Sequence, residues 1–410
     1  MKKYFFKKSN SIGKQELSSA IKVIKSGVLS KFVGTTGKDF YGGPMVQKFE
    51  RSCEKYFKVK HAVTVNSWTS GLVTIIGSIG IEPGDEIIVT PWTMCASATA
   101  ILHWNAIPVF VDIEDDTFNI NPNKIEEKIT SRTKAILTVD IFGHSCDIHK
   151  IMKIAKKYKL VVISDSAQAI GSKIGNKFSG TVAHVGGFSL NYHKHINTGE
   201  GGIIVTNKKN IFNKLCLIRN HGEAVIKSNK NKDLINVIGH NFRLGEIEAA
   251  IGIAQLRKLK KIFNQKYKIA INLQRQLRKL PYLKLPVIKN NYTHAFYIFG
   301  MVLDLKKIKR PRRLIVDLLR REGVPSLIEG YQNVHLLPMY QKKIAYGSKH
   351  FPWSFNKNNV SYNKGICPVA EGLHQNSFFG IEMCIYNLTL KDVIFISKAF
   401  KKVWKKLNLL

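Results

Sequence analysis

The sequence predicts an α/β protein with a mostly parallel, seven-stranded sheet in a large domain and a smaller C-terminal α+β domain. Three observations lead to this prediction. Seven apolar, β-branched runs of strand length lie between residues 61 and 207, and helical stretches separate several of them. Beyond Pro281 the pattern changes to mixed strands and helices. The 410 residues are also too many for one small core, which favours two domains.

The predicted strands of the large domain alternate with amphipathic helices, as a sheet covered on both faces requires. The strand runs are HAVTV (61–65), EIIVTP (86–91), PVFVDI (108–113), KAILTVDIF (134–142), LVVISD (160–165), GGFSL (186–190) and GGIIVTN (201–207). Predicted helices cover residues 72–79, 123–130 and 147–159, and a long helix runs from 244 to 280.

The smaller domain is expected to begin near residue 280, so the two domains cover residues 1–280 and 281–410. A strand at 297–305 precedes a helix around 312–323. The last stretch, 390–410, is cationic and amphipathic, and we expect it to pack on the core as a terminal helix. Its apolar residues at helical spacing are Val393, Ile396, Phe400, Val403 and Leu407.

Composition excludes several classes of protein. Hydrophobic residues make up 44% and charged residues 22%, which is ordinary for a soluble globular chain. No apolar stretch is long enough to span a bilayer, and the basic N-terminus has no apolar core behind it, so we expect neither integral membrane contact nor a signal peptide. Six scattered cysteines without CxxC pairs predict reduced thiols, no metal site and a cytoplasmic location.

The positive charge is the unusual feature of the composition. Lys and Arg number 64 against 28 acidic residues, a formal charge of +36. The lysines are spread along the whole chain, which is typical of solvated faces and not of a nucleic-acid stripe, so nucleic acid is not an expected partner. Attraction of a diphosphate-bearing substrate or of an anionic membrane surface stays open as an alternative role.

Polar residues follow several of the predicted strands, at 66–69, 165–168 and 189–194. In open α/β sheets the ligand site lies beyond the carboxyl ends of the strands. We therefore expect these three segments to line one site.

Lys194 stands in FSLNYHKHINTGEGG (188–202), between an apolar strand and a glycine-rich turn. A lysine held in a cleft with a lowered pKa is what a Schiff base with an aldehyde requires, although a lone lysine past a strand is usually solvated. Asp165 ends an apolar strand, where a carboxylate is costly without a partner. It could hold the ring nitrogen of pyridoxal 5′-phosphate (PLP) protonated, or it could simply cap the next helix.

A third element is a candidate phosphate cup. The segment NSWTSG (66–71) ends a strand and opens a helix, so that free backbone N–H groups and the helix dipole could hold a phosphate. Thr69 and Ser189 would add hydroxyl donors. As an isolated motif the cup is weak, because Ser and Thr are common helix caps.

Together with these segments, other blocks in the same order carry a family resemblance. They are GGPMVQKFE (42–50), EPGDEIIVTPWTMCASATAIL (82–102), PVFVDIEDDTFNINP (108–122), DSAQAIG (165–171), GHNFRLGEIEAAIGIAQL (239–256) and CPVAE (367–371). The chain resembles the DegT/DnrJ/EryC1/StrS group of PLP-dependent nucleotide-sugar aminotransferases, which have the fold-type-I aminotransferase architecture. The resemblance covers nearly the whole chain.

The resemblance implies a role for each matching residue. Lys194 would bind PLP covalently and shuttle protons, Asp165 would pair with the pyridine nitrogen, and Gln168 would lie beside the ring. Trp68, mainly by its backbone N–H, would contact the phosphate together with Thr69 and Ser189. Asn241, with Arg243 as a second candidate, would reach the cofactor phosphate of the other subunit, which makes a homodimer with shared active sites part of the expectation.

Two positions depart from the family pattern. Met94 falls where many relatives have an aromatic residue stacked on the PLP ring, so either its thioether or Trp92 would cover the ring. Asp140 replaces a common histidine, and the nearby His144 is more simply explained as a structural residue.

The resemblance implies transfer of an amino group from L-glutamate to a keto group of a nucleotide-linked sugar, for surface polysaccharide or glycan synthesis. Some relatives carry histidine in place of the lysine and act as sugar dehydratases, so lysine at 194 favours transamination. A related dehydratase, an aminotransferase of a non-nucleotide keto sugar acid, and a basic anion-binding module without catalysis are the alternatives.

Overall fold

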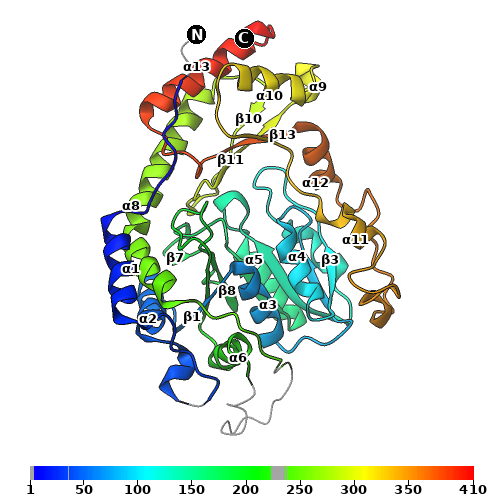
Figure 1. Ribbon diagram of the computed structural model, residues 1–410. Coiled ribbons are helices and arrows are strands. Elements are labelled where there is room, and N and C mark those ends of the chain that lie inside the picture. The colour runs from blue at the N-terminus through cyan, green and yellow to red at the C-terminus, as the bar shows by residue number, and fades with distance from the viewer. Residues whose placement is uncertain (1–3, 36, 223–235, 237) are drawn as a thin grey trace.

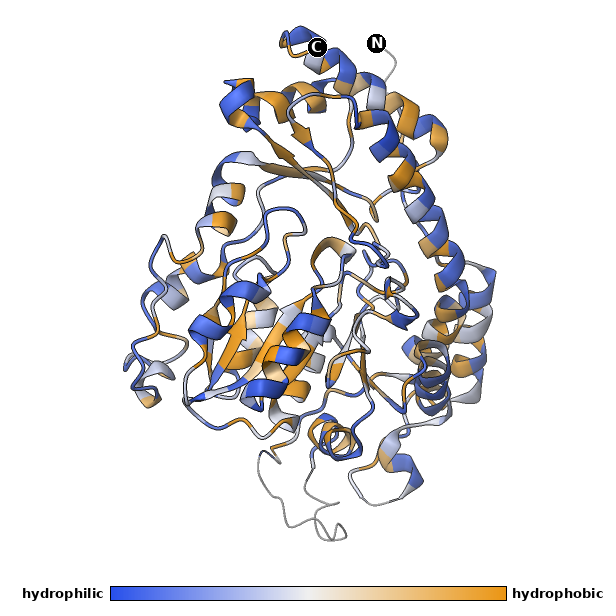
Figure 2. Ribbon diagram, turned by 180° about the vertical axis from the view of Figure 1, so that it is seen from behind, coloured by the Kyte–Doolittle hydropathy of each residue, from blue (hydrophilic) through white to orange (hydrophobic). Residues whose placement is uncertain are grey.

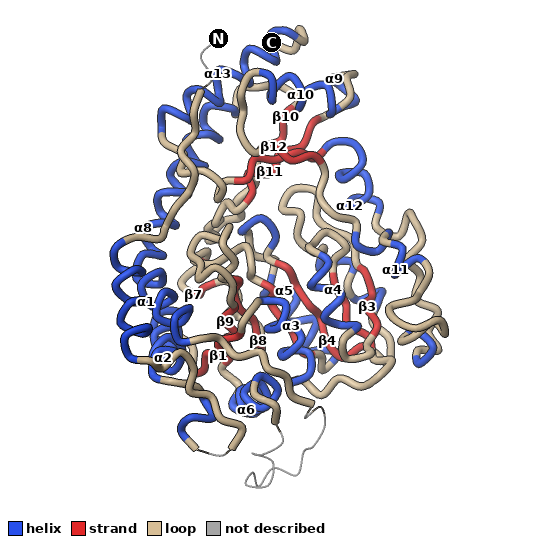
Figure 3. Tube along the Cα trace, viewed as in Figure 1, coloured by secondary structure: helices blue, strands red, loops and turns tan. Residues whose placement is uncertain are grey.

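The computed structural model describes residues 4–35, 37–222, 236 and 238–410. Two main sheets organise these residues, a large one in the lower part of the view and a small one above it (Figure 1; Figure 3). A third sheet has only two short strands, β6 (Lys173–Ile174) and β7 (Lys177–Phe178). No helix in the described part of the chain is long and apolar enough to cross a membrane.

The large sheet has seven strands in the order β1-β9-β8-β5-β4-β2-β3. The strands β8, β5, β4, β2 and β3 run parallel, whereas β9 is antiparallel to both of its neighbours. This confirms the predicted α/β class with a mostly parallel sheet. The bounds are β1 His61–Val65, β2 Glu86–Val89, β3 Ile107–Phe110, β4 Thr133–Val139, β5 Val161–Asp165, β8 Val185–Ser189 and β9 Gly202–Thr206.

Helices cover both faces of this sheet because its strands are apolar on both sides (Figure 2). In β1, for example, Val63 and Val65 face one core, which includes α3 (Trp68–Ser78), α4 (Cys95–Leu102) and α6 (Lys209–Arg219). Ala62 faces the opposite core, which is built with α2 (Pro44–Phe57) and α8 (Glu246–Leu277). Further along that face, α5 (Ile148–Tyr158) covers β4 and β5.

The small sheet has the order β10-β11-β13-β12 and is antiparallel throughout. Its strands are β10 Leu283–Lys284, β11 Ile298–Leu303, β12 Leu327–Glu329 and β13 Phe378–Glu382. Helices α9 (Leu305–Ile308), α10 (Arg312–Arg321) and α13 (Leu390–Lys406) lie near it, whereas α11 (Pro338–Gln341) and α12 (Pro368–Gly372) lie in the long connection between β12 and β13 (Figure 1). The proposed domain boundary near residue 280 falls between α8 and β10.

The terminal stretch forms α13, and four of its five apolar positions are buried in the core of the small sheet: Val393, Ile396, Phe400 and Val403. Phe6, near the N-terminus, belongs to the same core, as does Leu273 from the far end of α8. Helix α8 therefore reaches from the core of the large sheet to that of the small one (Figure 1).

Two local predictions were wrong. Residues 123–130 form two 3₁₀ turns, Pro122–Lys124 and Glu126–Lys128, in place of a helix. The hydroxyl oxygen of Thr133 accepts a hydrogen bond from the backbone N–H of Thr130. This side-chain hydrogen bond competes with the backbone hydrogen bonds that a helix would need there. Helix α3 begins at Trp68, four residues before the predicted start, because Ser67 caps it by accepting the N–H of Ser70.

Candidate functional site

The polar ends of the parallel strands meet at one cavity of about 160 Å³. Seven of the eight predicted site residues line it: Trp68, Thr69, Met94, Asp165, Gln168, Ser189 and Lys194. Asn241 does not; its side chain is exposed, and its carbonyl oxygen accepts a hydrogen bond from Asn66 beyond the end of β1.

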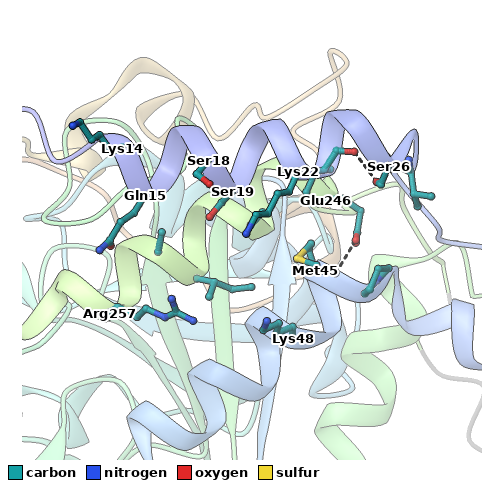
Figure 4. Close-up of a pocket in the computed structure, with 16 residues that line it drawn as sticks. Lys14, Gln15, Ser18, Ser19, Lys22, Ser26, Met45, Lys48, Glu246 and Arg257 are labelled. Carbon is teal, nitrogen blue, oxygen red and sulfur yellow. Dashed lines mark hydrogen bonds between the residues drawn. The ribbon is translucent and has the colours of Figure 1, made fainter.

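A larger cavity, of about 620 Å³, lies elsewhere, between α1 (Lys14–Ser26), α2 and α8 (Figure 4). The lysines that line it, Lys14, Lys22 and Lys48, are exposed at its rim. Glu246, at its wall, accepts the N–H groups of Met45 and Val46. This cavity therefore lacks a desolvated amine such as that of Lys194 in the smaller one, and we place the chemistry in the smaller one.

Asp165 is the last residue of β5, and its carboxylate is buried with three donors around it. Oδ1 accepts the indole N–H of Trp68 at 2.7 Å and the backbone N–H of Ala167 at 3.1 Å. Oδ2 accepts the hydroxyl of Ser97 at 2.8 Å. Burial raises the pKa of Asp165, while the hydrogen bonds from Ser97 and Trp68 and the charge of Lys194 work in the opposite direction.

Lys194 follows β8 and projects its amine into the same cavity. Burial lowers the pKa of Lys194 from 10.5 to about 8, although the charge of Asp165 opposes the shift. Its Nζ lies 4.3 Å from the ring centroid of Tyr297, a cation–π contact. The amine is thus half-buried beside an aromatic face and becomes neutral about two pH units earlier than an ordinary lysine.

The side chains of the two histidines that flank Lys194 lie in different environments. His193 lines the cavity, and burial together with the Lys194 charge lowers its pKa to about 4, so it is neutral at physiological pH. His195 is buried on the other side, where its Nε2 lies 2.7 Å from the carbonyl oxygen of Ala295. Of these two histidines, His193 is therefore the one that lines this cavity.

Gln168 is held at both ends of its amide. Its Oε1 accepts the N–H of Phe142 at 2.8 Å, and its Nε2 donates to the hydroxyl of Tyr331 at 3.1 Å. Tyr331 comes from the chain just after β12, so this hydrogen bond connects the cavity wall of the large sheet with the C-terminal part of the chain.

The start of α3 has the properties of an anion site. Ser67 caps the helix, and the N–H groups of Trp68 and Thr69 in its first turn have no recorded acceptor in the described part of the chain. Ser189 ends β8 nearby in the cavity wall. Asn191 adds a buried amide oxygen for which no donor is found among the described residues.

The two departures from the family pattern also have definite positions. Met94 lines the cavity and is 61% exposed, whereas Trp92 is fully buried among aromatic rings that include Phe118 and Phe378. Of these two side chains, only Met94 faces the cavity. His144 is buried, with Nδ1 2.8 Å from the carbonyl oxygen of Ser145, as a structural histidine would be.

Asp140 is buried one strand from Asp165 and accepts the hydroxyl of Ser166 at 2.5 Å and the N–H of Cys146 at 3.0 Å. Burial, together with the nearby Asp165 charge, raises its pKa to about 6. It is not among the residues that line the cavity.

Sequence reasoning assigned no role to two residues that contact this site, Ser97 and Tyr297. Ser97 lies in α4, and Thr93 contacts its hydroxyl at 2.8 Å. Tyr297 precedes β11. Ser97 stands in the 82–102 block but has no role assigned there, and Tyr297 lies outside the blocks, so the tertiary structure identifies the contacts of both.

The donor set fits PLP group by group. The desolvated amine of Lys194 suits an aldehyde, and the buried carboxylate of Asp165 suits a protonated ring nitrogen. The free N–H groups at the start of α3 suit a phosphate.

Comparison with known proteins supports the same family. Residues 33–371 match the DegT/DnrJ/EryC1/StrS aminotransferase family. The GDP-perosamine synthase of Escherichia coli O157:H7 is 35% identical over 304 residues, which cover 73% of this chain and 80% of that protein. The UDP-4-amino-4,6-dideoxy-N-acetyl-beta-L-altrosamine transaminase of Helicobacter pylori is 34% identical over 300 residues, 72% of this chain and 77% of that protein.

A solved structure is similar over the full length. Helicobacter pylori PseC, an aminotransferase involved in the biosynthesis of pseudoaminic acid, superposes with a TM-score of 0.80 at 27% identity and covers 99% of this chain and 100% of its own.

The lowered pKa of Lys194 gives a pH prediction. Only the neutral amine attacks an aldehyde, so the rate at which the cofactor-free protein takes up PLP should rise about tenfold per pH unit below 8 and level off above it. Stopped-flow absorbance between pH 6 and 10 measures this rate. A rate that keeps rising to pH 10 would mean that Lys194 has the pKa of an exposed lysine.

Proposed function

Since the chain belongs to the DegT/DnrJ/EryC1/StrS aminotransferase family, we propose that it transfers an amino group from L-glutamate to a keto group of a nucleotide-linked sugar. The amino sugar would be used in a surface polysaccharide or another glycan. A cytoplasmic location is part of the proposal, because all six cysteines are free thiols and five are buried.

One observation carries the proposal: a half-buried lysine amine with a lowered pKa shares a cavity with a buried carboxylate. In a structural ion pair the charged nitrogen and oxygen atoms usually lie within 4 Å of each other. Lys194 and Asp165 do not form such a pair. Both groups keep the capacity to bind different ends of one ligand. Perturbed pKa values in a cleft are typical of catalytic groups.

The residues named above would hold PLP as follows. Lys194 would attach it covalently, Asp165 would pair with the ring nitrogen, and Gln168 would lie beside the ring. Met94 would cover the ring, a role that its exposed position at the cavity supports. Trp68 and Thr69, through their backbone N–H groups, and Ser189, through its hydroxyl, would bind the phosphate.

When bound, the cofactor supplies an electron sink that weakens the C–H bond beside the amino group. The chain supplies the base for that proton. We assign this role to Nζ of Lys194, which is neutral above about pH 8 and lies against the ring of Tyr297. The neutral His193 in the cavity wall can accept or donate one hydrogen bond to the substrate without adding charge.

A nucleotide-linked sugar is the proposed acceptor because two relatives act on such compounds by name, one linked to GDP and one to UDP. Both are more than 30% identical to this chain over more than two thirds of its length. The shared chemistry of a diphosphate-linked sugar is also compatible with the chain's charge of +36.

A homodimer is part of the proposal. Asn241 lies outside the cavity of its own subunit with an exposed side chain, yet its backbone adjoins Asn66, next to the cap of α3. A residue at the edge of one site and free to project outward is well placed to complete a neighbouring site. In the proposed dimer, Asn241 of each subunit would contact the phosphate in the other.

A spectral titration tests the function. The purified protein with PLP should be yellow, L-glutamate should bleach the band, and a nucleotide-linked keto sugar should restore it as the amino sugar appears by mass spectrometry. Lys194→Ala should lose at least about 10³-fold in turnover while keeping its fold, because the base is lost. A band that ignores glutamate, or full turnover by Lys194→Ala, would refute the proposal.

Subunit mixing tests the shared site. Lys194→Ala and Asn241→Asp should each be inactive alone, but one site of a mixed dimer contains both wild-type residues. Random exchange should therefore restore about a quarter of the wild-type activity. If the mixture stays inactive after subunit exchange has been verified by native mass spectrometry, Asn241 acts within its own subunit.

A further inference from the structure

The indole of Trp68 makes a hydrogen bond that a residue of the proposed phosphate-binding turn would not need. Its Nε1 donates to Oδ1 of Asp165 at 2.7 Å, across 97 residues of sequence. The side chain is 7% exposed, so both partners of this hydrogen bond are buried. Hydrogen bonds to a buried charged group are among the strongest in proteins.

The surrounding chain makes room for this contact. Gly187 is the partner of Asp165 in the β5–β8 register, and a Cβ there would lie 2.5 Å from Cζ3 of the Trp68 ring. Gly71, one turn along α3, would place a Cβ 3.0 Å from Cε3 of the same ring. Two glycines on two different elements therefore leave the space that the indole occupies.

The three donors to Asp165 are not equivalent. The hydroxyl of Ser97 can rotate toward Thr93, whose hydroxyl lies 2.8 Å away, and the N–H of Ala167 belongs to the local turn. The indole N–H of Trp68 can only donate, and its ring is fixed by packing. It is the side-chain donor with no alternative partner in this cluster.

We propose that Trp68 is a positioning residue, whose indole N–H fixes and keeps anionic the Asp165 carboxylate so that the carboxylate can pair with a positively charged ring nitrogen. The inference rests on the proposed function, because the ring nitrogen is that of the proposed cofactor. Oδ1 takes two donors and Oδ2 only one, so a lone pair on Oδ2 stays available for a further N–H.

The test compares two ligands and three proteins. Trp68→Phe keeps an aromatic ring in the same space but removes the N–H. The matched control is Trp104→Phe, because Trp104 is also buried and its Nε1 donates to a backbone carbonyl, that of Val73, at 2.7 Å. The ligands are PLP and its carbocyclic analogue, in which C–H replaces the ring nitrogen, so that no ion pair with Asp165 can form.

We expect Trp68→Phe to weaken PLP binding by about tenfold, since part of a charged hydrogen bond is lost. Binding of the analogue should change less than about twofold, because the carboxylate has no charge to meet. Trp104→Phe should alter neither affinity. Affinities come from absorbance and fluorescence titration of the cofactor-free proteins, and circular dichroism checks the fold.

Two outcomes overturn the inference alone. If Trp68→Phe binds PLP as the wild type does, the indole N–H has no positioning role. If Trp68→Phe weakens the binding of PLP and of the analogue by the same factor, Trp68 only shapes the cavity. A wild-type protein that binds no PLP would instead overturn the proposed function and the inference with it.

A second variant tests the inference if Trp68→Phe does not fold. Benzothienylalanine at position 68 has a ring of nearly the same shape, with sulfur in place of the N–H. It should give the same discrimination between PLP and the analogue, and equal affinities for the wild type and this variant would contradict the inference.

Discussion

The rest of this site depends on keeping an amine and a carboxylate of opposite charge in one cavity where both groups are partly or fully removed from water. Burial opposes the charge on each group, lowering the pKa of Lys194 and raising that of Asp165, and each charge partly offsets the cost of the other. The parallel strands β5 and β8 lie side by side and end at the same edge of the sheet, which places Asp165 and the chain leading to Lys194 together. The donors around Asp165 offset part of the cost of burying its charge.

Much of the fold could be predicted because its signals are local. Each β-branched run of the large domain became a strand, and the stripe that contains Ile396 and Phe400 became the buried face of α13. The misses were also local in origin. Thr130 and Thr133 use their side chains where a helix was expected, and Ser67 moves the start of α3 forward to Trp68. Propensity and periodicity do not register such side-chain bonds to the backbone.

The site could be predicted only as far as its motifs reach. Asp165 and Lys194 stand out because they follow apolar strands, and the resemblance to a family adds Gln168 and Met94. No role could be assigned to Ser97 or Tyr297 in this way: Ser97 lies in an alanine-rich helix within the 82–102 block, and Tyr297 precedes a buried strand. Their roles follow from how α4 and the chain entering β11 pack against the large sheet, a long-range relation that spacing along the sequence does not encode.

The central claim is that Lys194, among the many lysines of a chain with 64 basic residues, is the one that holds the cofactor. Borohydride reduction of the PLP-loaded protein, followed by proteolysis and mass spectrometry, tests it most directly. The account predicts a single phosphopyridoxyl group on the peptide that contains Lys194, and none at that level in Lys194→Ala. A label spread over exposed lysines, or unchanged in Lys194→Ala, would contradict it.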